Sequence, residues 1–242
     1  MLECMTRRRW IADTWTETTA SLKGEQAGHL ARVLRAQPGQ IFDVVANGFL
    51  HRAEIVSVDE REVVFALHEE LEAESALPVH LLMAVFKFDH MEWGMEKATE
   101  LGVARMTPVI ARRTEKHLAQ AAAKRVERWR RIVREASQQS RRSDVPEVDD
   151  PVTLKVALGM VSAERKLLLA ETEQENSLRT ALESSEGEAA SVALAIGPEG
   201  GWAAEEMVLF AESGWRSVTL GPRILRAETA AIAGLAVCAA ML

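Results

Sequence analysis

Cysteine is nearly absent from this chain, and the scarcity excludes two common kinds of stabilising site. Only Cys4 and Cys238 occur among the 242 residues. Two cysteines cannot by themselves form a disulfide framework or a zinc site. We therefore expect no structural metal ion and a reducing compartment.

Long apolar runs are also missing. The longest, residues 229–242, is too short to cross a bilayer and is better interpreted as a core helix. The arginines at 7–9 are not followed by the apolar stretch that a signal peptide needs. The sequence therefore predicts a cytoplasmic protein without membrane association.

The chain lacks an overall positive charge, since its formal net charge is −7. Residues 105–142 nevertheless carry 12 Lys and Arg against 3 Asp and Glu. Such a local concentration on an acidic protein is typical of a site for a polyanion. The alternative is a solvated helix face, because many of these residues fall between the apolar positions of a long helix predicted over 118–139.

The order of the predicted elements indicates an α/β protein with two domains. Short strands dominate the first part, with the clearest hairpin at 41–56 around the turn Asn47-Gly48. This pattern predicts a small β-barrel over residues 1–72. Strands and helices then alternate, which predicts a parallel sheet with covering helices over residues 73–242.

Two strand-to-helix junctions in the second part share an unusual composition. The sequence GPEGG at 197–201 follows a predicted strand, and LGPRIL at 220–225 follows another. Ligands bind at the carboxyl ends of parallel strands, and glycine allows close approach of the backbone. Two such loops predict one ligand site, with a pair of ordinary turns as the alternative. The dinucleotide fingerprint GxGxxG is absent, which disfavours an NAD-type site.

The two loops, extended to RAETA at 226–230, resemble the signature of the SPOUT-class RNA methyltransferases. Within that class they look like the ribosomal RNA small-subunit methyltransferase E family, and KATELG at 97–102 fits the same pattern. The resemblance implies an N-terminal PUA-like β-barrel that binds RNA. It also implies a C-terminal SPOUT α/β domain with a parallel sheet and a trefoil knot.

The same resemblance implies a function. The expected cofactor is S-adenosylmethionine, and the expected reaction is methylation of N3 of a uridine in small-subunit ribosomal RNA, with naked RNA and the assembled subunit both open as substrates. SPOUT enzymes typically pair through their knotted domains, so a homodimer is expected.

Site residues are assigned from these motifs. Arg226 is expected to stabilise the charge that develops on the uracil oxygens, since guanidinium offers a fixed fork of donors. Glu199 and Glu228 are expected to orient that arginine or relay the proton, with a simple ion pair as the alternative. Cofactor binding is expected from Ile196, Gly197, Pro198, Gly200, Gly201, Leu220, Gly221, Ile224, Leu225 and Arg226. RNA binding is expected from Arg7, Arg8, Arg9, Arg35, Arg125, Arg128 and Arg142.

Two other functions stay open on the sequence. A SPOUT methyltransferase with another target, such as a ribose 2′-O, would share the cofactor loops, although the N-terminal barrel and the RAETA segment disfavour it. A catalytically inactive RNA-binding or ribosome-assembly protein would have a degenerate site, whereas the glycines and Arg226 are intact.

Overall fold

The computed structural model describes residues 9–183 and 191–242. Cys4, Arg7, Arg8 and residues 184–190 therefore lie outside the described residues. The chain divides into two compact units, Met1–Ser75 with Arg134–Val145 and Ala76–Val133 with Pro146–Leu242. Each unit has its own apolar core. The functional boundary predicted after residue 72 stays a prediction.

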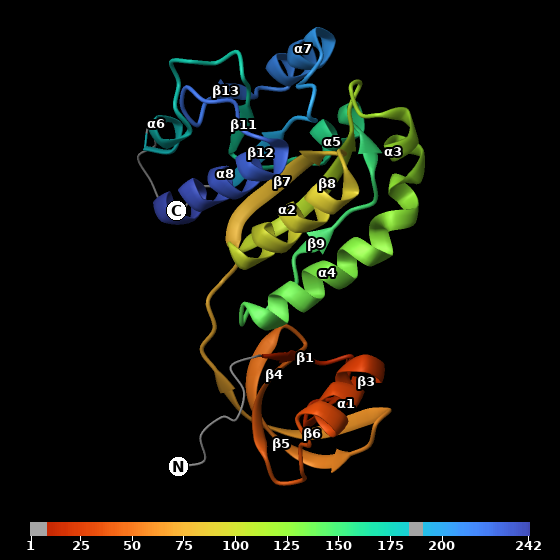
Figure 1. Ribbon diagram of the computed structural model, residues 1–242. Helices are drawn as coiled ribbons and strands as arrows, with labels where there is room; N and C mark the ends of the chain where they lie inside the picture. Colours follow the sequence, from red (N-terminus) through yellow and green to blue (C-terminus); the bar gives the residue numbers. More distant parts are fainter. Residues whose placement is uncertain (1–8, 184–190) are drawn as a thin grey trace. The chain divides into compact units, whose positions relative to one another are not determined.

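The first unit is a six-stranded sheet that is antiparallel except where β1 pairs with β4 (Figure 1). The predicted hairpin is confirmed, because β4 and β5 pair across a turn with positive φ at Asn47 and Gly48. Trp10, Phe42 and Phe65 are buried in the core. The elements are β1 (Trp10–Ile11), β2 (Thr14–Trp15), β3 (Thr19–Lys23), α1 (Gly24–Gly28), a π-helical turn (His29–Val33), β4 (Ile41–Ala46), β5 (Phe49–Val58) and β6 (Glu62–Leu71).

The second unit is built on a parallel sheet, as predicted. Its strand order is β10-β8-β7-β12-β11-β13, with β9 also paired to β8. Every strand pair in it is parallel. The strands are β7 (Leu77–Ala84), β8 (Val103–Ile110), β9 (Glu147–Val148), β10 (Val152–Thr153), β11 (Arg165–Leu169), β12 (Val192–Ile196) and β13 (Arg216–Val218).

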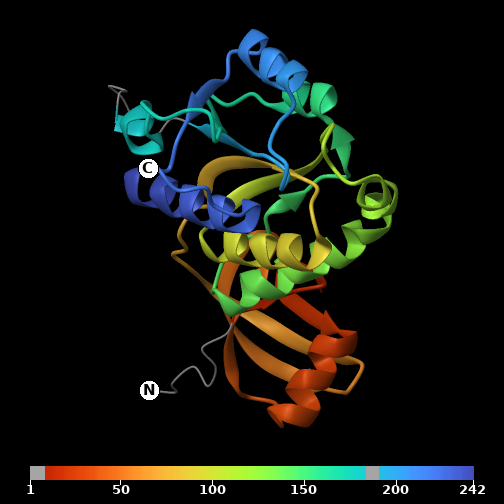
Figure 2. The same ribbon diagram turned by 45° about the horizontal axis from the view of Figure 1, so that its top comes forward.

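Helices cover both faces of this sheet. The views in Figures 1 and 2 agree that α2 and α8 lie side by side on one face. Leu194 of the central strand β12 packs in that layer, whereas Ala193 and Ala195 pack in the layer with α5 and α7. All of β12 is buried, as expected for a strand between two helical layers. The helices are α2 (Phe88–Glu100), α3 (Lys116–Ala121), α4 (Val126–Gln139), α5 (Leu154–Met160), α6 (Leu178–Glu183), α7 (Ala204–Glu212) and α8 (Ala227–Met241).

The prediction of one continuous helix over 118–139 is wrong. Helix α3 ends at Ala121, a 3₁₀ turn covers Ala122–Arg125, and α4 follows. The buried positions Leu118, Ala122 and Val126 stay on one side. Apolar residues three and four apart fit both helix types over a single turn, so their spacing did not reveal the change.

The last helix begins earlier than its sequence predicts. Its first residue is Ala227 and its N-cap is Arg226, so Thr229 lies inside the helix. None of the described helices is long and apolar enough to cross a membrane. Within residues 9–183 and 191–242, no group of three or more His, Cys, Asp or Glu side chains is arranged to hold a metal ion.

Candidate functional site

A cavity of about 990 Å³ lies in the second unit at the carboxyl ends of β11, β12 and β13. The structure thus brings both glycine-containing loops to one place. All ten residues assigned to cofactor binding line this cavity: Ile196, Gly197, Pro198, Gly200, Gly201, Leu220, Gly221, Ile224, Leu225 and Arg226.

The loop after β12 depends on a glycine at its tightest point. Gly201 has φ +69°, and its N–H donates to the carbonyl of Pro198 at 2.8 Å. A side chain at Gly201 would be strained in this left-handed conformation. The indole of Trp202 packs edge-on against Phe210, with ring centroids 4.8 Å apart. A turn with an apolar anchor therefore shapes this wall of the cavity.

Two polar contacts tie the same loop to the segment that follows β8. The buried carboxylate of Glu206 accepts the backbone N–H of Ala203 at 2.9 Å through one oxygen. Its other oxygen accepts the N–H of Arg112 at 2.8 Å. Arg113 Nη1 donates to the carbonyl of Gly200 at 2.6 Å and also lines the cavity. These contacts hold two chain segments nearly a hundred residues apart in fixed register.

The loop after β13 is held mainly by its own polar groups. The hydroxyl of Thr219 accepts the N–H of Gly221 and donates to the same residue's carbonyl, each at 3.1 Å. Gly221 has φ +120°. Ile224 is 79% exposed although it lines the cavity, so an apolar side chain stands uncovered at this wall.

Sequence reasoning missed three parts of the cavity wall. The segment Leu169–Gln174 after β11 forms a third loop, and Lys87, His90 and Arg113 come from the start of α2 and the segment after β8. The third loop has no glycine, so the sequence indicates a ligand-binding role for it only through its position after a parallel strand. In that loop Glu173 accepts backbone N–H groups from Asn176 and Glu175, which lower its pKa.

The residues assigned to catalysis separate into two environments. Arg226 and Glu199 line the cavity, and Glu199 lies 3.9 Å from the amine of Lys87. Glu228 does not line it. Its side chain is 6% exposed and lies 3.4 Å from Nδ1 of His90. Among the described residues no ion pair joins Arg226 to either carboxylate; Glu199 lies near Lys87 and Glu228 near His90 instead. The orienting role and the simple ion pair therefore both stay predictions.

The arginines assigned to RNA in the first unit differ in availability. Arg35 is exposed, with φ +52°. Arg9 donates to the carbonyl of Arg141. Arg142 is buried and ion-paired with Asp144, which leaves it poorly placed for a phosphate. Arg7 and Arg8 lie outside the described residues.

In the second unit, one acidic residue engages both assigned arginines. Arg128 binds the carboxylate of Glu92 through two contacts of 2.8 Å. Arg125 lies 3.6 Å from the same carboxylate and stacks over Phe88 at 4.7 Å. Both side chains nevertheless remain close to half exposed.

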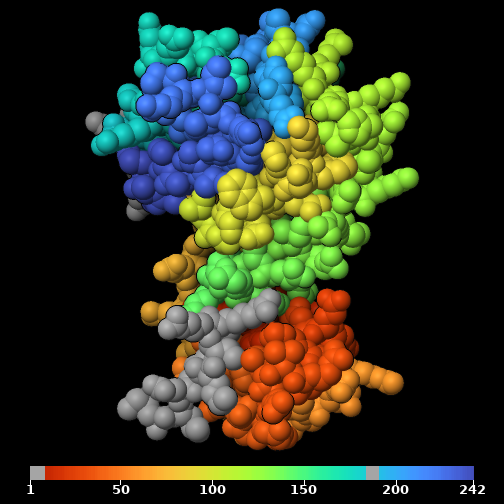
Figure 3. All heavy atoms as spheres, in the orientation of Figure 1, coloured from red at the N-terminus to blue at the C-terminus, as the bar shows by residue number. Residues whose placement is uncertain are grey.

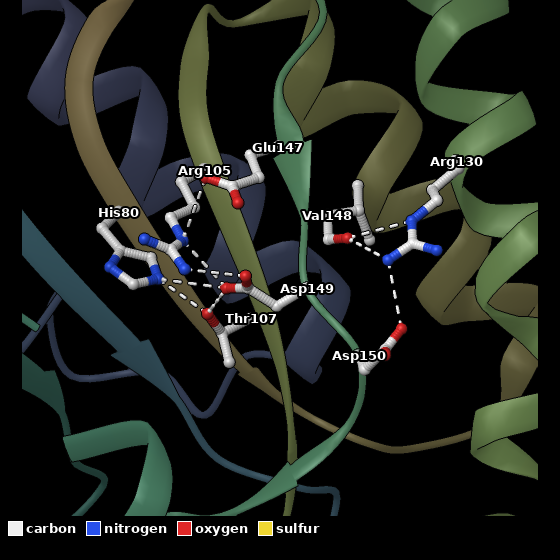
Figure 4. A network of polar contacts seen from close by, with 8 residues as sticks. All are labelled: His80, Arg105, Thr107, Arg130, Glu147, Val148, Asp149 and Asp150. Atoms are coloured by element: carbon white, nitrogen blue, oxygen red, sulfur yellow. Dashed lines mark hydrogen bonds and ion pairs between the residues drawn. The ribbon is translucent and has the colours of Figure 1, made fainter. Parts of the chain in front are cut away.

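Other cations of the basic segment are neutralised internally. Figure 4 shows Arg105 paired with Asp149, and Arg130 bonded to the carbonyl of Val148 and to Asp150. Asp149 also accepts the hydroxyl of Thr107. The positive charge counted along 105–142 therefore overstates the charge available to a polyanion.

Comparison with known proteins identifies both parts of the chain. A model of an RNA methyltransferase domain matches residues 73–239, and a model of an RNA methyltransferase PUA domain matches residues 22–67. The ribosomal RNA small subunit methyltransferase E of Synechocystis sp. is 35% identical over 228 residues, which cover 93% of this chain and 74% of that protein.

Solved structures agree over nearly the whole chain. A putative methyltransferase from Legionella pneumophila, in complex with S-adenosylmethionine, is 32% identical with a TM-score of 0.82 over 96% of both chains. The ribosomal RNA small subunit methyltransferase E from Neisseria gonorrhoeae, bound to S-adenosylmethionine, is 29% identical with a TM-score of 0.82 over 95% of both chains. The chain therefore belongs to the ribosomal RNA small subunit methyltransferase E family, an α/β family of RNA methyltransferases with a PUA-like N-terminal domain.

Proposed function

We propose that this protein methylates N3 of a uridine in small-subunit ribosomal RNA, with S-adenosylmethionine as methyl donor. The convergence of the loops after β11, β12 and β13 on one cavity is the observation that carries the proposal. Family membership supports it, because two solved relatives bind S-adenosylmethionine.

The residues of the cavity fit such a ligand. Ile196, Leu220 and Leu225 offer apolar surface for an adenine, and the glycine loops that line the same cavity bring backbone N–H and C=O groups for its edge. The carboxylates of Glu171 and Glu199 suit a ligand with a sulfonium and an ammonium group. When bound, S-adenosylmethionine supplies an electrophilic methyl group.

Arg226 is the proposed stabiliser of the reacting uracil. As N3 loses its proton, negative charge spreads to O2 and O4, and a guanidinium in the cavity wall donates hydrogen bonds to that charge. Glu199, which lies near the amine of Lys87, is proposed to orient the substrate in the cavity. The ten cavity-lining residues assigned to the cofactor, which include Arg226, form the proposed active site together with Glu199.

RNA binding is proposed for Arg7, Arg8, Arg9 and Arg35 in the N-terminal part of the chain. Of these, Arg35 is exposed and Arg9 is half-buried. In the second unit it is proposed for Arg125 and Arg128, whose side chains are close to half exposed beside Glu92. Each phosphate contact releases counterions, so a fall in affinity with rising salt is expected. Arg142 is withdrawn from this set, because its side chain is buried against Asp144.

A homodimer is proposed on the surface of α8. Beyond its first turn this helix consists of apolar residues and one glycine, yet Ala236, Ala239 and Ala240 are exposed. Figure 3 shows α8, in dark blue, at the surface beside α2. A helix that is apolar on every side is normally buried, so a second copy of the chain is proposed to cover this surface.

The trefoil knot and a cytoplasmic location are also proposed, on the basis of family membership.

The decisive experiment is product mapping. Naked small-subunit rRNA and assembled small subunits lacking the modification are incubated with enzyme and S-adenosylmethionine, and nuclease digests are analysed by mass spectrometry. N3-methyluridine at one position is the expected product. A ribose 2′-O-methylated nucleotide would establish the alternative target, and no cofactor-dependent product on either substrate would establish an inactive RNA-binding protein.

A further inference from the structure

A histidine and a buried glutamate meet at the wall of the cavity. His90 is in the first turn of α2 and lines the cavity, while Glu228 is in the first turn of α8. The two helices pack closely at Gly94, where an added Cβ would lie 3.7 Å from Cβ of Glu228. Gly94 of α2 therefore lies within van der Waals reach of Glu228 at the start of α8.

The geometry of the pair is that of a base and its orienting carboxylate. Nδ1 of His90 lies 3.4 Å from Oε1 of Glu228, and both Nδ1 and the second carboxylate oxygen are buried without a hydrogen bond among the described residues. A buried carboxylate that lacks donors is costly, which favours a tighter contact with the imidazole. Hydrogen bonds of catalytic groups are often long before substrate binds and shorten afterwards.

We propose that His90 is the general base that removes the N3 proton of the target uridine, and that Glu228 positions it. This inference rests on the function proposed above. With Nδ1–H donated to Glu228, Nε2 presents a lone pair toward substrate. Nε2 takes the proton, the N3 electron pair forms the bond to the methyl carbon, and the carbon–sulfur pair returns to sulfur. The imidazolium that results is balanced by the Glu228 carboxylate.

The charged groups around the imidazole are compatible with this role. On α2 itself, Asp89 lies 3.8 Å from Nε2, but its side chain is 78% exposed and can rotate into water. Lys87 and Glu199 neutralise one another across the cavity wall. Arg226, the N-cap of α8, also lines the cavity, as do Arg113 and Arg223. Substrate oxygens would meet Arg226 while the N3 proton meets His90.

The test compares His90→Ala with a matched control, His117→Ala. His117 also lies beside a carboxylate, 3.5 Å from Glu115, but its side chain is 72% exposed and does not line the cavity. Single-turnover formation of N3-methyluridine is measured with saturating cofactor between about pH 6 and pH 9, a range that spans histidine titration. Cofactor and RNA affinities are measured in parallel by calorimetry and filter binding.

The expected loss for His90→Ala is about 100- to 10,000-fold in single-turnover rate, the usual contribution of a general base. The rate of the His90→Ala variant should rise in proportion to hydroxide concentration, because only uridine that is already ionised reacts. Added imidazole should restore part of the lost rate. Both affinities should stay unchanged, and His117→Ala should match the wild type. Glu228→Gln should retain the fold, lose part of the rate and shift the pH profile.

Two results would overturn the inference. One is a His90→Ala rate within about threefold of wild type, well short of a general-base effect. The other is a slow variant whose pH profile is unchanged and which imidazole does not rescue, since that pattern marks a structural residue. In either case the wild-type product would still be N3-methyluridine. Failure of the proposed function is a different observation, namely a different methylated atom or no product from the wild type.

Discussion

Glu206 offers a sharp test of how the cavity is held together. Each of its carboxylate oxygens accepts one backbone N–H, from Ala203 at 2.9 Å and from Arg112 at 2.8 Å, and the residue is 3% exposed. The substitution Glu206→Gln keeps the shape but leaves only one acceptor. Its amide NH₂ must then face a backbone N–H. One charge-assisted hydrogen bond is lost and one buried donor stays unsatisfied.

The magnitude follows from those contacts. A hydrogen bond to a charged group contributes about 1.5–3 kcal/mol, so Glu206→Gln should lower the free energy of unfolding by about 2 kcal/mol. That corresponds to about 4–8 °C in Tm for a chain of this size. The lost contact, to Ala203 or to Arg112, is one of those that hold the loop after β12. Cofactor affinity should therefore fall together with stability.

The assay is urea unfolding followed by tryptophan fluorescence, with cofactor affinity from calorimetry. Glu205→Gln is the matched control, because Glu205 is the adjacent residue on α7 and is exposed. The control should change stability by less than about 0.5 kcal/mol, as is usual for surface positions. Equal stability and equal cofactor affinity for the two variants would refute the reasoning.

Three further predictions concern the site and the sheet beneath it. Arg226→Ala should lower the single-turnover rate about 100- to 1000-fold, with cofactor affinity nearly unchanged in calorimetry; a parallel loss of both would make the residue structural. Gly201→Val places a branched side chain at φ +69°, so calorimetry should show at least a tenfold weaker cofactor in a folded variant, and unchanged affinity would contradict the assignment. Burial and the nearby Arg105 lower the pKa of His80 from 6.5 to about 4. The unfolded chain therefore binds a proton between these pH values that the folded chain does not, and stability should fall by up to about 3 kcal/mol as pH drops through this window. Urea titrations of His80→Gln should lack that slope, and an unchanged slope would assign it to another group.

Much of the fold could be predicted because apolar periodicity reports burial directly. The strand at β12 is a continuous apolar run, and it is buried on both faces. Glycine and proline mark the loops after β12 and β13, and both loops line the cavity. Helix type within 118–139 could not be read, since the same apolar spacing suits α and 3₁₀ turns.

The rest of the site depends on contacts between distant segments, which no local pattern contains. Glu206 looks like a solvated helix residue, yet it is buried because Arg112 lies opposite it. Arg128 looks like a free cation, but its carboxylate partner Glu92 comes from another helix. His90 carries no signal of its own either, because its importance comes from the position of Glu228.

The order of strands in the parallel sheet has a consequence for synthesis of the protein. The central strand β7 pairs with β12, so that Val79 meets Val192 more than a hundred residues later in the chain. On the ribosome, at about 5–20 residues per second, β7 emerges several seconds before β12. One edge of β7 stays open during that interval, and the cavity cannot exist until α8 has also emerged. A chain that stalls before residue 192 would expose an unpaired apolar edge to chaperones or aggregation.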